Sequence, residues 1–300
     1  ILILGTSPDW VEQLRQSQLA PGGLADSPLV RSLIRNPLVI FTLLVSFSLA
    51  HTSVRADDDP AINDAGLNDV HFVDANQGWA VGDRGAIWHT DNGGRTWQLQ
   101  PSGTVCSLRS VWFSGDKMGW IVGGQSLPYS PASSGLILAT WDGGLSWQPV
   151  SWQQYPRLQR VQVPNAKSGW AWGEASEYYP SGLFTSENSG RLWQPVTGST
   201  SLGWLGGFFT GPDSGVLAGV GGATAVVQNR SVRLMGIGSL GSRSIRCVKF
   251  SNDGTAWAVA DGGVILRSNS LGASWSVMTS GMPEQYPAIF DWHGVHAVAG

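Results

Sequence analysis

The sequence predicts an all-β protein and, within that class, a β-propeller of four-stranded blades. Three observations favour this fold. The composition has 40 Gly and 16 Trp in 300 residues but only 13% charged residues, as is typical of short strands joined by tight turns. The octet 90-TDNGGRTW-97 recurs along the chain, and an apolar strand pattern containing Gly-Trp lies upstream of most copies.

The spacing of the octets gives the length of the repeat. Each octet closes on a tryptophan, at Trp97, Trp147, Trp193 and Trp275, so the gaps are 50, 46 and 82 positions, and 82 is twice 41. This spacing predicts a further copy at 227-VQNRSVRL-234, with Asn229 in the place of the Asp and Leu234 in the place of the Trp. Repeats of about 40 to 50 residues with four short strands each are typical of β-propellers.

The strand pattern upstream of the octets predicts five repeat units and the beginning of a sixth. The segments are 70-VHFVDANQGWAVG-82, 111-VWFSGDKMGWIVG-123, 161-VQVPNAKSGWAWG-173, 215-GVLAG-219, 248-VKFSNDGTAWAVA-260 and 289-IFDWHGVHAVAG-300. In the first unit, alternation with a period of two predicts strands at 69–74, 78–82, 86–90 and 96–100. The octet then spans the turn between the third and fourth strands of a unit.

Each residue of the octet has a structural role in a tight turn. Gly93 and Gly94 can adopt positive φ without a Cβ clash, and Asn92 can accept hydrogen bonds from backbone N–H groups across the turn. The hydroxyl of Thr96 can join this network, and Trp97 can bury a large ring between blades. The competing interpretation is a repeated catalytic loop. Because no octet carries a His, a Cys or a pair of carboxylates, we expect a structural turn.

These residues carry a family resemblance. The pattern [ST]-x-[DN]-x-G-x-[ST]-W resembles the Asp-box, or bacterial neuraminidase repeat. The longer unit F-x-[DS]-x-x-x-G-W-A-V-G…T-x-D-G-G-x-[ST]-W resembles the photosystem II stability/assembly factor-like family of exported β-propellers, over about residues 65 to 300. The sequence departs from the pattern with Asn at 92 and 188, Ser at 270 and Leu192. The expected structural Asp-box residues are Thr90, Asn92, Gly94, Thr96, Trp97, Thr140, Asp142, Gly144, Ser146, Trp147, Ser186, Asn188, Gly190, Trp193, Ser268, Gly272, Ser274 and Trp275.

The resemblance also implies a blade number and a role. It implies about seven blades in the full protein, five of which are readable here with a partial sixth at the C-terminal end of the sequence. In photosynthetic members of the family, the propeller is a non-enzymatic chaperone for a photosystem II reaction-centre subunit. The leading functional expectation is therefore a protein-binding scaffold or assembly factor, associated peripherally with a membrane complex.

The N-terminal region predicts export. Arg31 and Arg35 precede the uncharged apolar run 38-LVIFTLLVSFSLA-50, and Val54 and Ala56 fit the small-residue pattern before a cleavage site. The predicted division is an uncertain upstream segment at 1–29, a signal peptide at 30–56 cleaved after Ala56, a linker at 57–64 and the propeller at 65–300. An uncleaved membrane anchor is the alternative. The expected location is the periplasm, the cell envelope or the outside of the cell.

Other functional classes are disfavoured. A net charge of −3 argues against general nucleic-acid binding. The segment 236-GIGSLG-241 matches G-x-G-x-x-G but lies in a connection before a strand, outside any βαβ unit, so we expect a loop. Two of the histidines, His293 and His296, lie near the end of the sequence without a third ligand, and no metal or cofactor is expected. Cys106 and Cys247 fall in different units, which predicts two separate thiols.

An enzymatic role is the runner-up. A sialidase would need an Arg triad and a Tyr nucleophile with an acid partner, and the F/Y-R-I-P segment of sialidases is absent from the sequence. None of the five tyrosines has a convincing partner. We therefore expect that the protein is not an enzyme. The alternative is a carbohydrate-active or carbohydrate-binding propeller similar to sialidases. A part of a larger secreted multidomain protein is a third interpretation.

One surface remains as a candidate for binding. In a propeller, the loops between second and third strands and the connections between blades share the face opposite the octet turns. Loops on a rigid scaffold often carry recognition, and Arg with Tyr and Trp is the composition of binding hot spots. The alternative is a scatter of solvated arginines. The predicted partner-binding face, for an acidic or extended polypeptide, comprises Arg84, Arg109, Tyr129, Trp152, Tyr155, Arg157, Arg160, Tyr178, Tyr179, Arg243 and Arg246.

Overall fold

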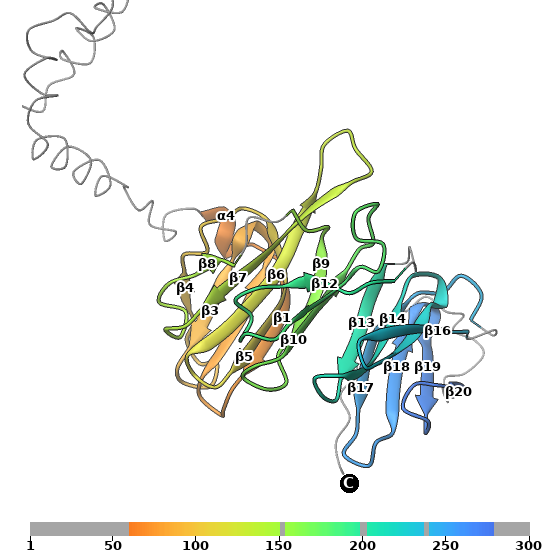
Figure 1. Ribbon diagram of the computed structural model, residues 1–300. Helices are drawn as coiled ribbons and strands as arrows, with labels where there is room; N and C mark the ends of the chain where they lie inside the picture. Colours follow the sequence, from red (N-terminus) through yellow and green to blue (C-terminus); the bar gives the residue numbers. More distant parts are fainter. Residues whose placement is uncertain (1–59, 151–153, 199–202, 237–239, 279–300) are drawn as a thin grey trace, which may run out of the picture. The chain divides into compact units, whose positions relative to one another are not determined.

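The chain forms five four-stranded antiparallel sheets, which are the blades of a β-propeller. The computed structural model describes residues 60–150, 154–198, 203–236 and 240–278 (Figure 1). In each sheet, strands adjacent in sequence are adjacent in space. The predicted all-β propeller is therefore confirmed. The expected partial sixth unit at 289–300, the predicted signal peptide and the segment 236-GIGSLG-241 fall wholly or partly outside the described residues.

The strands are grouped into blades in chain order. Blade one contains β1 (Leu67–Phe72), β2 (Gly78–Gly82), β3 (Ile87–Thr90) and β4 (Gln98–Gln100), and blade two contains β5 (Ser107–Ser114), β6 (Met118–Ser126), β7 (Ser133–Thr140) and β8 (Gln148–Pro149). Blade three contains β9 (Leu158–Gln162), β10 (Gly169–Gly173), β11 (Leu183–Ser186) and β12 (Gln194–Pro195). Blade four contains β13 (Trp204–Phe209), β14 (Ser214–Gly219), β15 (Thr224–Gln228) and β16 (Ser231–Met235). Blade five contains β17 (Ile245–Phe250), β18 (Ala256–Ala260), β19 (Val264–Ser268) and β20 (Ser276–Met278).

Helical structure is short in the described part of the chain. It comprises α4 (Pro60–Asn63) and the three-residue 3₁₀ turns η3 (Asp83–Gly85), η4 (Val220–Gly222) and η5 (Asp261–Gly263). No helix among the described residues is long and apolar enough to cross a bilayer. The 3₁₀ turns connect the second and third strands of blades one, four and five.

The four strands predicted for blade one are present, with shifted ends. β2 has its predicted bounds, whereas β1 begins and ends two residues earlier than expected. The side chain of Asp74 accepts hydrogen bonds of 2.7 Å from the N–H groups of Asn76 and Gln77, and this turn ends the strand early. β4 begins only at Gln98, because Thr96 belongs to the turn network.

In the second strand of blades one to four, the glycine that pairs near the start of the first strand is required by a close approach of two backbones. A Cβ on Gly82 would lie 2.3 Å from the carbonyl oxygen of Gly66, and one on Gly123 would lie 2.2 Å from that of Ser107. At the same place the pairing of the first and second strands is irregular. Blade five has Ala260 at this position. The recurring Gly after the Trp strand is therefore set by the geometry of the blade.

The core lies between neighbouring blades and is built on the tryptophan of the Gly-Trp pairs. Trp79 in blade one stacks on Phe113 in blade two, with ring centroids 3.6 Å apart. Trp170 in blade three stacks on Phe209 in blade four at 4.3 Å. All four side chains are at most 3% exposed. The glycine before each tryptophan leaves room for the aromatic ring, since a Cβ on Gly119 would lie 2.5 Å from Phe113.

The Asp-box turn of blade two is closed by side-chain hydrogen bonds. Thr140 Oγ1 donates to Asp142 Oδ1 at 2.7 Å and accepts from the N–H of Gly144 at 2.8 Å. Asp142 also accepts from the N–H and the hydroxyl of Ser146, at 2.9 and 2.6 Å. Hydrogen bonds from Ser146, then from Thr140, lower the pKa of Asp142 to about 2.

The turns that depart from the Asp pattern keep most of this network. Asn92 accepts from the N–H of Thr96 at 2.9 Å and donates to its hydroxyl at 2.6 Å. In blade three, Leu192 has no hydroxyl, but its N–H still donates to Asn188 at 2.9 Å. In blade five, Ser270 accepts from the N–H of Ser274 at 2.9 Å. Asn and Ser can therefore replace Asp because the acceptor oxygen is what the backbone requires.

Blade four corrects one sequence expectation. Gln228 pairs directly with Ser231, so β15 and β16 are joined by a two-residue turn, Asn229 and Arg230, with φ of 50° and 61°. The segment 227–234 is therefore a tight hairpin, and Asn229 does not occupy the Asp place of an octet. Val232 packs against the core between blades three and four, whereas Leu234, expected in the place of the Trp, is 49% exposed.

Candidate binding site lined by the inner strands

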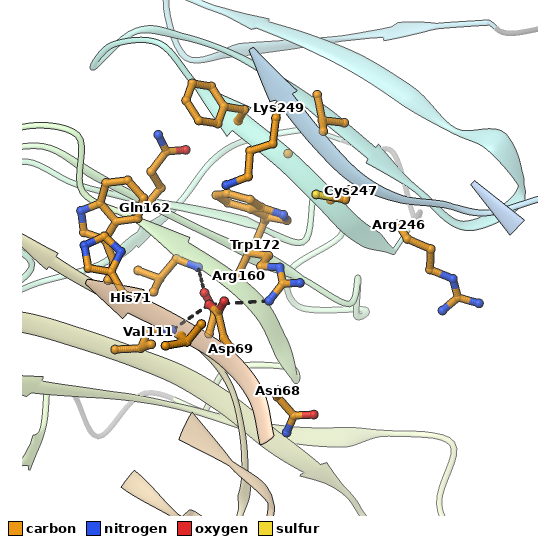
Figure 2. Close-up of a pocket in the computed structure, with 18 of the residues that line it drawn as sticks. Asn68, Asp69, His71, Val111, Arg160, Gln162, Trp172, Arg246, Cys247 and Lys249 are labelled. Atoms are coloured by element: carbon orange, nitrogen blue, oxygen red, sulfur yellow. Dashed lines mark hydrogen bonds and ion pairs between the residues drawn. The ribbon is translucent and has the colours of Figure 1, made fainter. Parts of the chain in front are cut away.

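The first strands of the five blades, here called the inner strands, line one cavity of about 670 Å³ (Figure 2). They are β1, β5, β9, β13 and β17, and each contacts the next in chain order. Since the first strand of a blade pairs with only one neighbour in its sheet, its other edge is free to face this cavity. The inner strands therefore decide the chemistry of the cavity.

Two glycines in β13 shape this inner-strand cavity. A Cβ on Gly206 would lie 2.9 Å from the backbone of Arg246 and Cys247 in β17. A Cβ on Gly207 would lie 3.0 Å from the indole ring of Trp172, which also lines the cavity. The other inner strands carry side chains at the positions of these glycines, such as Arg160 in β9. The glycine pair therefore lets blades three and five approach blade four closely.

Hydrogen bonds between consecutive inner strands fix the lining. Asp69 in β1 accepts from the N–H of Val111 in β5 at 3.1 Å, and Ser110 in β5 accepts from the N–H of Val161 in β9 at 3.4 Å. Both acceptors occupy the same register position of their strands. Blades one and two thus each supply a side chain that accepts from a free edge N–H of the next blade.

Two positions further along the strand, the same relation recurs with larger side chains. Trp112 Nε1 donates to the carbonyl of Val163 at 2.8 Å. The amide of Gln162 donates to the carbonyl of Phe209 at 2.8 Å and accepts from its N–H at 2.9 Å. His71 occupies this position in β1, with its ring centroid 4.8 Å from that of Trp112. Burial lowers the pKa of His71 and so favours the neutral imidazole, and Asp69 opposes this effect.

The charges in the cavity include one cation without a carboxylate. Arg160 lies 3.7 Å from Asp69 and donates to the carbonyl of Arg109 at 3.1 Å; Figure 2 shows Asp69 joined to both Val111 and Arg160. Arg246 donates to Asp261 at 2.7 and 3.3 Å. Lys249 lies over the ring of Phe208 at 5.7 Å and, among the described residues, forms no ion pair. The lining therefore has an excess of positive charge.

The structure brings two of the arginines predicted for the partner-binding face into one cavity and places three others at or near the ends of the inner strands or the turns beside them. Arg160 and Arg246 line the inner-strand cavity. Arg109 and Arg84 lie close enough to Asp83 to contribute to its lowered pKa, which is caused first by hydrogen bonds from Ser107 and Asn68. Arg243 is exposed and donates to the carbonyl of Leu240 at 3.4 Å.

The remaining predicted residues lie elsewhere. Arg157, Tyr178 and Tyr179 lie in and around the loop 174–182, which follows β10, and Tyr129 lies at the tip of the β6–β7 hairpin. Tyr155 is only 2% exposed and packs edge-on against Phe184, so its inclusion in an exposed face was wrong. Trp152 lies outside the described residues.

Three residues of the cavity, Lys249, Asp69 and Gln162, were not predicted from the sequence. A signal was present, because each of these residues lies next to an apolar residue of the strand pattern, at Val70, Val161 and Val248, and neighbouring side chains of a strand point to opposite faces. Aligning the inner strands on the residue before the register shift, such as Leu67, Leu108 and Leu158, places the missed residues and Arg160 at two strand positions. Both cysteines are free thiols, as expected, and Cys247 lines the cavity. No group of three or more metal-ligand side chains occurs among the described residues.

The five blades, with octet turns in blades one, two, three and five, define the chain as an Asp-box β-propeller. A family model described as "Photosynthesis system II assembly factor YCF48" matches residues 58–289, and the chain belongs to this family. The match extends through all five blades.

Comparison with solved structures shows the same fold. "YCF48 bound to D1 peptide" is 21% identical with a TM-score of 0.55, and the match covers 72% of this chain and 69% of that chain. The GH74 enzyme of Niastella koreensis is 13% identical with a TM-score of 0.55, and the match covers 71% of this chain and 37% of the enzyme. No curated protein matches the chain.

Proposed function

We propose that this protein is a non-enzymatic, exported assembly factor that binds a polypeptide in the inner-strand cavity. The observation that carries the proposal is the excess of positive charge in a cavity built from rigid strands, with Arg160 and Arg246 already paired and Lys249 left without a carboxylate. Charge complementarity favours an acidic segment. Membership of the YCF48 family supports photosystem II as the setting, and the D1 peptide bound by a related propeller supports a polypeptide ligand.

The lining favours binding over glycoside hydrolysis. Glycosidases commonly use two carboxyl groups, one as acid and one as nucleophile or base. Among the described residues that line the cavity, Asp69 is the single carboxylate, and it is engaged by Val111 and Arg160. Its hydrogen bonds are those of a structural acceptor between blades. The likeness to a GH74 enzyme concerns the fold alone.

Export is part of the proposal, on the strength of the apolar run at 38–50 and the small residues that follow it. We expect residues 30–300, expressed behind an initiator Met in a bacterial host, to reach the periplasm and to begin at Asp57. N-terminal sequencing of the periplasmic fraction tests this expectation. Retention of the run in a membrane-bound product would instead favour the uncleaved anchor.

The binding proposal is tested with a fluorescent D1 peptide as the probe. Lys249→Gln removes the unpaired charge and should lower the affinity for the peptide by roughly fivefold, which is the effect of losing about 1 kcal/mol of charge attraction. Lys167→Gln serves as the matched control, because Lys167 is exposed on the turn before β10 and lies outside the cavity lining. Fluorescence anisotropy at low and high salt measures both affinities. Equal affinity of the two variants, or no binding by the unsubstituted protein, would refute the proposal.

A further inference from the structure

A second cavity, of about 810 Å³, lies between the β6–β7 hairpin and the loop 174–182; we call it the hairpin groove. The hairpin is longer than its counterparts, since β6 and β7 have 9 and 8 residues whereas β2 and β3 have 5 and 4. Figure 1 shows it projecting past the other strands of its sheet. The hairpin groove shares no lining residue with the inner-strand cavity.

The two walls of the hairpin groove are joined by a polar network at its base. Glu174, on the loop, accepts from Ser133 Oγ of the hairpin at 2.5 Å and from Arg157 Nε at 2.9 Å. Arg157 also donates to Ser126 Oγ at 3.2 Å, and its N–H donates to Ser133 Oγ at 2.9 Å. These contacts fix the hairpin against blade three. The groove is therefore formed before any ligand arrives, which lowers the entropic cost of binding.

The floor of the groove is fixed as well. The N–H of Gly135 in β7 donates to the carbonyl of Tyr155 at 2.7 Å, so the segment before β9 pairs with the edge of the hairpin. Tyr179 packs against Phe184, with ring centroids 5.2 Å apart, and its N–H donates to the carbonyl of Ser176 at 3.2 Å. The loop that carries Tyr178 is thereby held in one conformation.

The open part of the groove combines aromatic, apolar and acidic groups. Tyr178 is 86% exposed and Leu127 is 38% exposed, and Pro131 lines the same wall as Leu127. Glu177 is exposed and, among the described residues, forms no ion pair. Since Arg157 and Glu174 neutralise each other, the net charge of the groove is that of Glu177. Its sign is opposite to that of the inner-strand cavity.

We propose that the hairpin groove binds an extended polypeptide segment that carries a basic side chain next to prolyl residues. Aromatic grooves bind prolyl segments because these are already extended and lose little entropy. The carboxylate of Glu177 attracts the basic group, and the ring of Tyr178 can lie against a guanidinium. The groove and the inner-strand cavity select opposite charges, so the protein can hold two segments of different chemistry at once. This site is independent of the function proposed above.

The test uses a fluorescein-labelled peptide of Pro, Leu and Arg, and the same peptide with Glu in place of Arg. Anisotropy should show binding of the Arg peptide, weakening as salt rises, and much weaker binding of the Glu peptide. Glu177→Lys should lower the affinity for the Arg peptide by roughly fivefold or more. Asp116→Lys is the matched control and should leave affinity unchanged, because Asp116 is exposed at the opposite end of β6.

A second pair of variants separates the aromatic contribution. Tyr178→Ala should lower the affinity for the Arg peptide by roughly threefold to tenfold. Leu145→Ala is the control and should leave this affinity unchanged, because Leu145 is 81% exposed on the octet turn of blade two. All four substitutions are at exposed positions, and circular dichroism verifies that the blades are intact. Equal binding of the Arg and Glu peptides overturns the proposal, as does equal loss in Glu177→Lys and Asp116→Lys. Absence of binding by the unsubstituted protein also overturns it.

Discussion

At the scale of single residues, the octet turns show which atoms the repeat requires. In blades one and two, the Asx residue accepts from an N–H four positions on, whether it is Asn92 or Asp142. The second oxygen of Asp142 accepts the hydroxyl of Ser146, and the amide of Asn92 instead donates to the hydroxyl of Thr96. The turn therefore needs an oxygen acceptor, and the negative charge only adds a dependence on pH.

This distinction predicts the behaviour of Asp142 variants. The folded pKa of about 2 lies below the ordinary value of 3.8, so the carboxylate stabilises the fold fully above pH 4, and this contribution is lost as pH falls from about 4 to 2. Asp142→Ala should lower stability at pH 7 by about 1 kcal/mol, a moderate loss because the turn is exposed to water. Urea denaturation at several pH values measures both effects.

Asp142→Asn is the informative control for that prediction. By analogy with Asn92, it should retain stability at pH 7 to within about 0.5 kcal/mol, because its oxygen still accepts from the backbone. Its stability should change less than that of the unsubstituted protein between pH 4 and pH 2. A loss at pH 7 as large as that of Asp142→Ala would show that the charge, and not the acceptor, closes the turn.

At the scale of strands and turns, the sequence predicted the repeat well because local chemistry and blade geometry impose the same residues. Gly123 is needed for backbone approach and Gly144, with φ of 86°, for the turn, so the first recurs in blades one to four and the second in every octet. Blade four keeps the strand glycine but lacks the octet turn. A two-residue turn with Asn229 replaces the octet there, and the repeat spacing predicts where the hairpin lies but not its turn type.

The candidate site was less predictable, because the sequence pattern predicts strands but does not show which strands line a cavity. The arginines were assigned to a loop face, yet Arg160 lies within an inner strand beside Asp69 of another blade. Tyr155 resembled a surface anchor but pairs its backbone with Gly135 and is buried. The surroundings of these residues depend on contacts between blades. A sequence repeat shows which positions of two blades are equivalent, but not which residues of one blade contact the next.

At the scale of the molecule, the blades hold together through aromatic pairs that cross from one blade to the next. Phe113 at the end of β5 stacks on Trp79 of blade one, and its edge meets Trp147 of its own blade with ring centroids 5.8 Å apart. Phe72 has the equivalent place in β1, but it is 41% exposed and meets Trp97 at 6.1 Å. Phe113 and Phe72 thus occupy equivalent strand positions, but Phe113 is buried between two blades and Phe72 is partly exposed to water.

The difference predicts unequal costs for the same truncation. Phe113→Ala should lower the stability of the propeller by about 3 to 5 kcal/mol, because it removes a 3%-exposed ring from between two tryptophans and leaves a cavity. Phe72→Ala should cost roughly 1 kcal/mol, since much of that ring already contacts water. Chemical denaturation followed by Trp fluorescence compares the two midpoints. Equal losses would mean that packing within each blade, and not the contact between blades one and two, stabilises this part of the propeller.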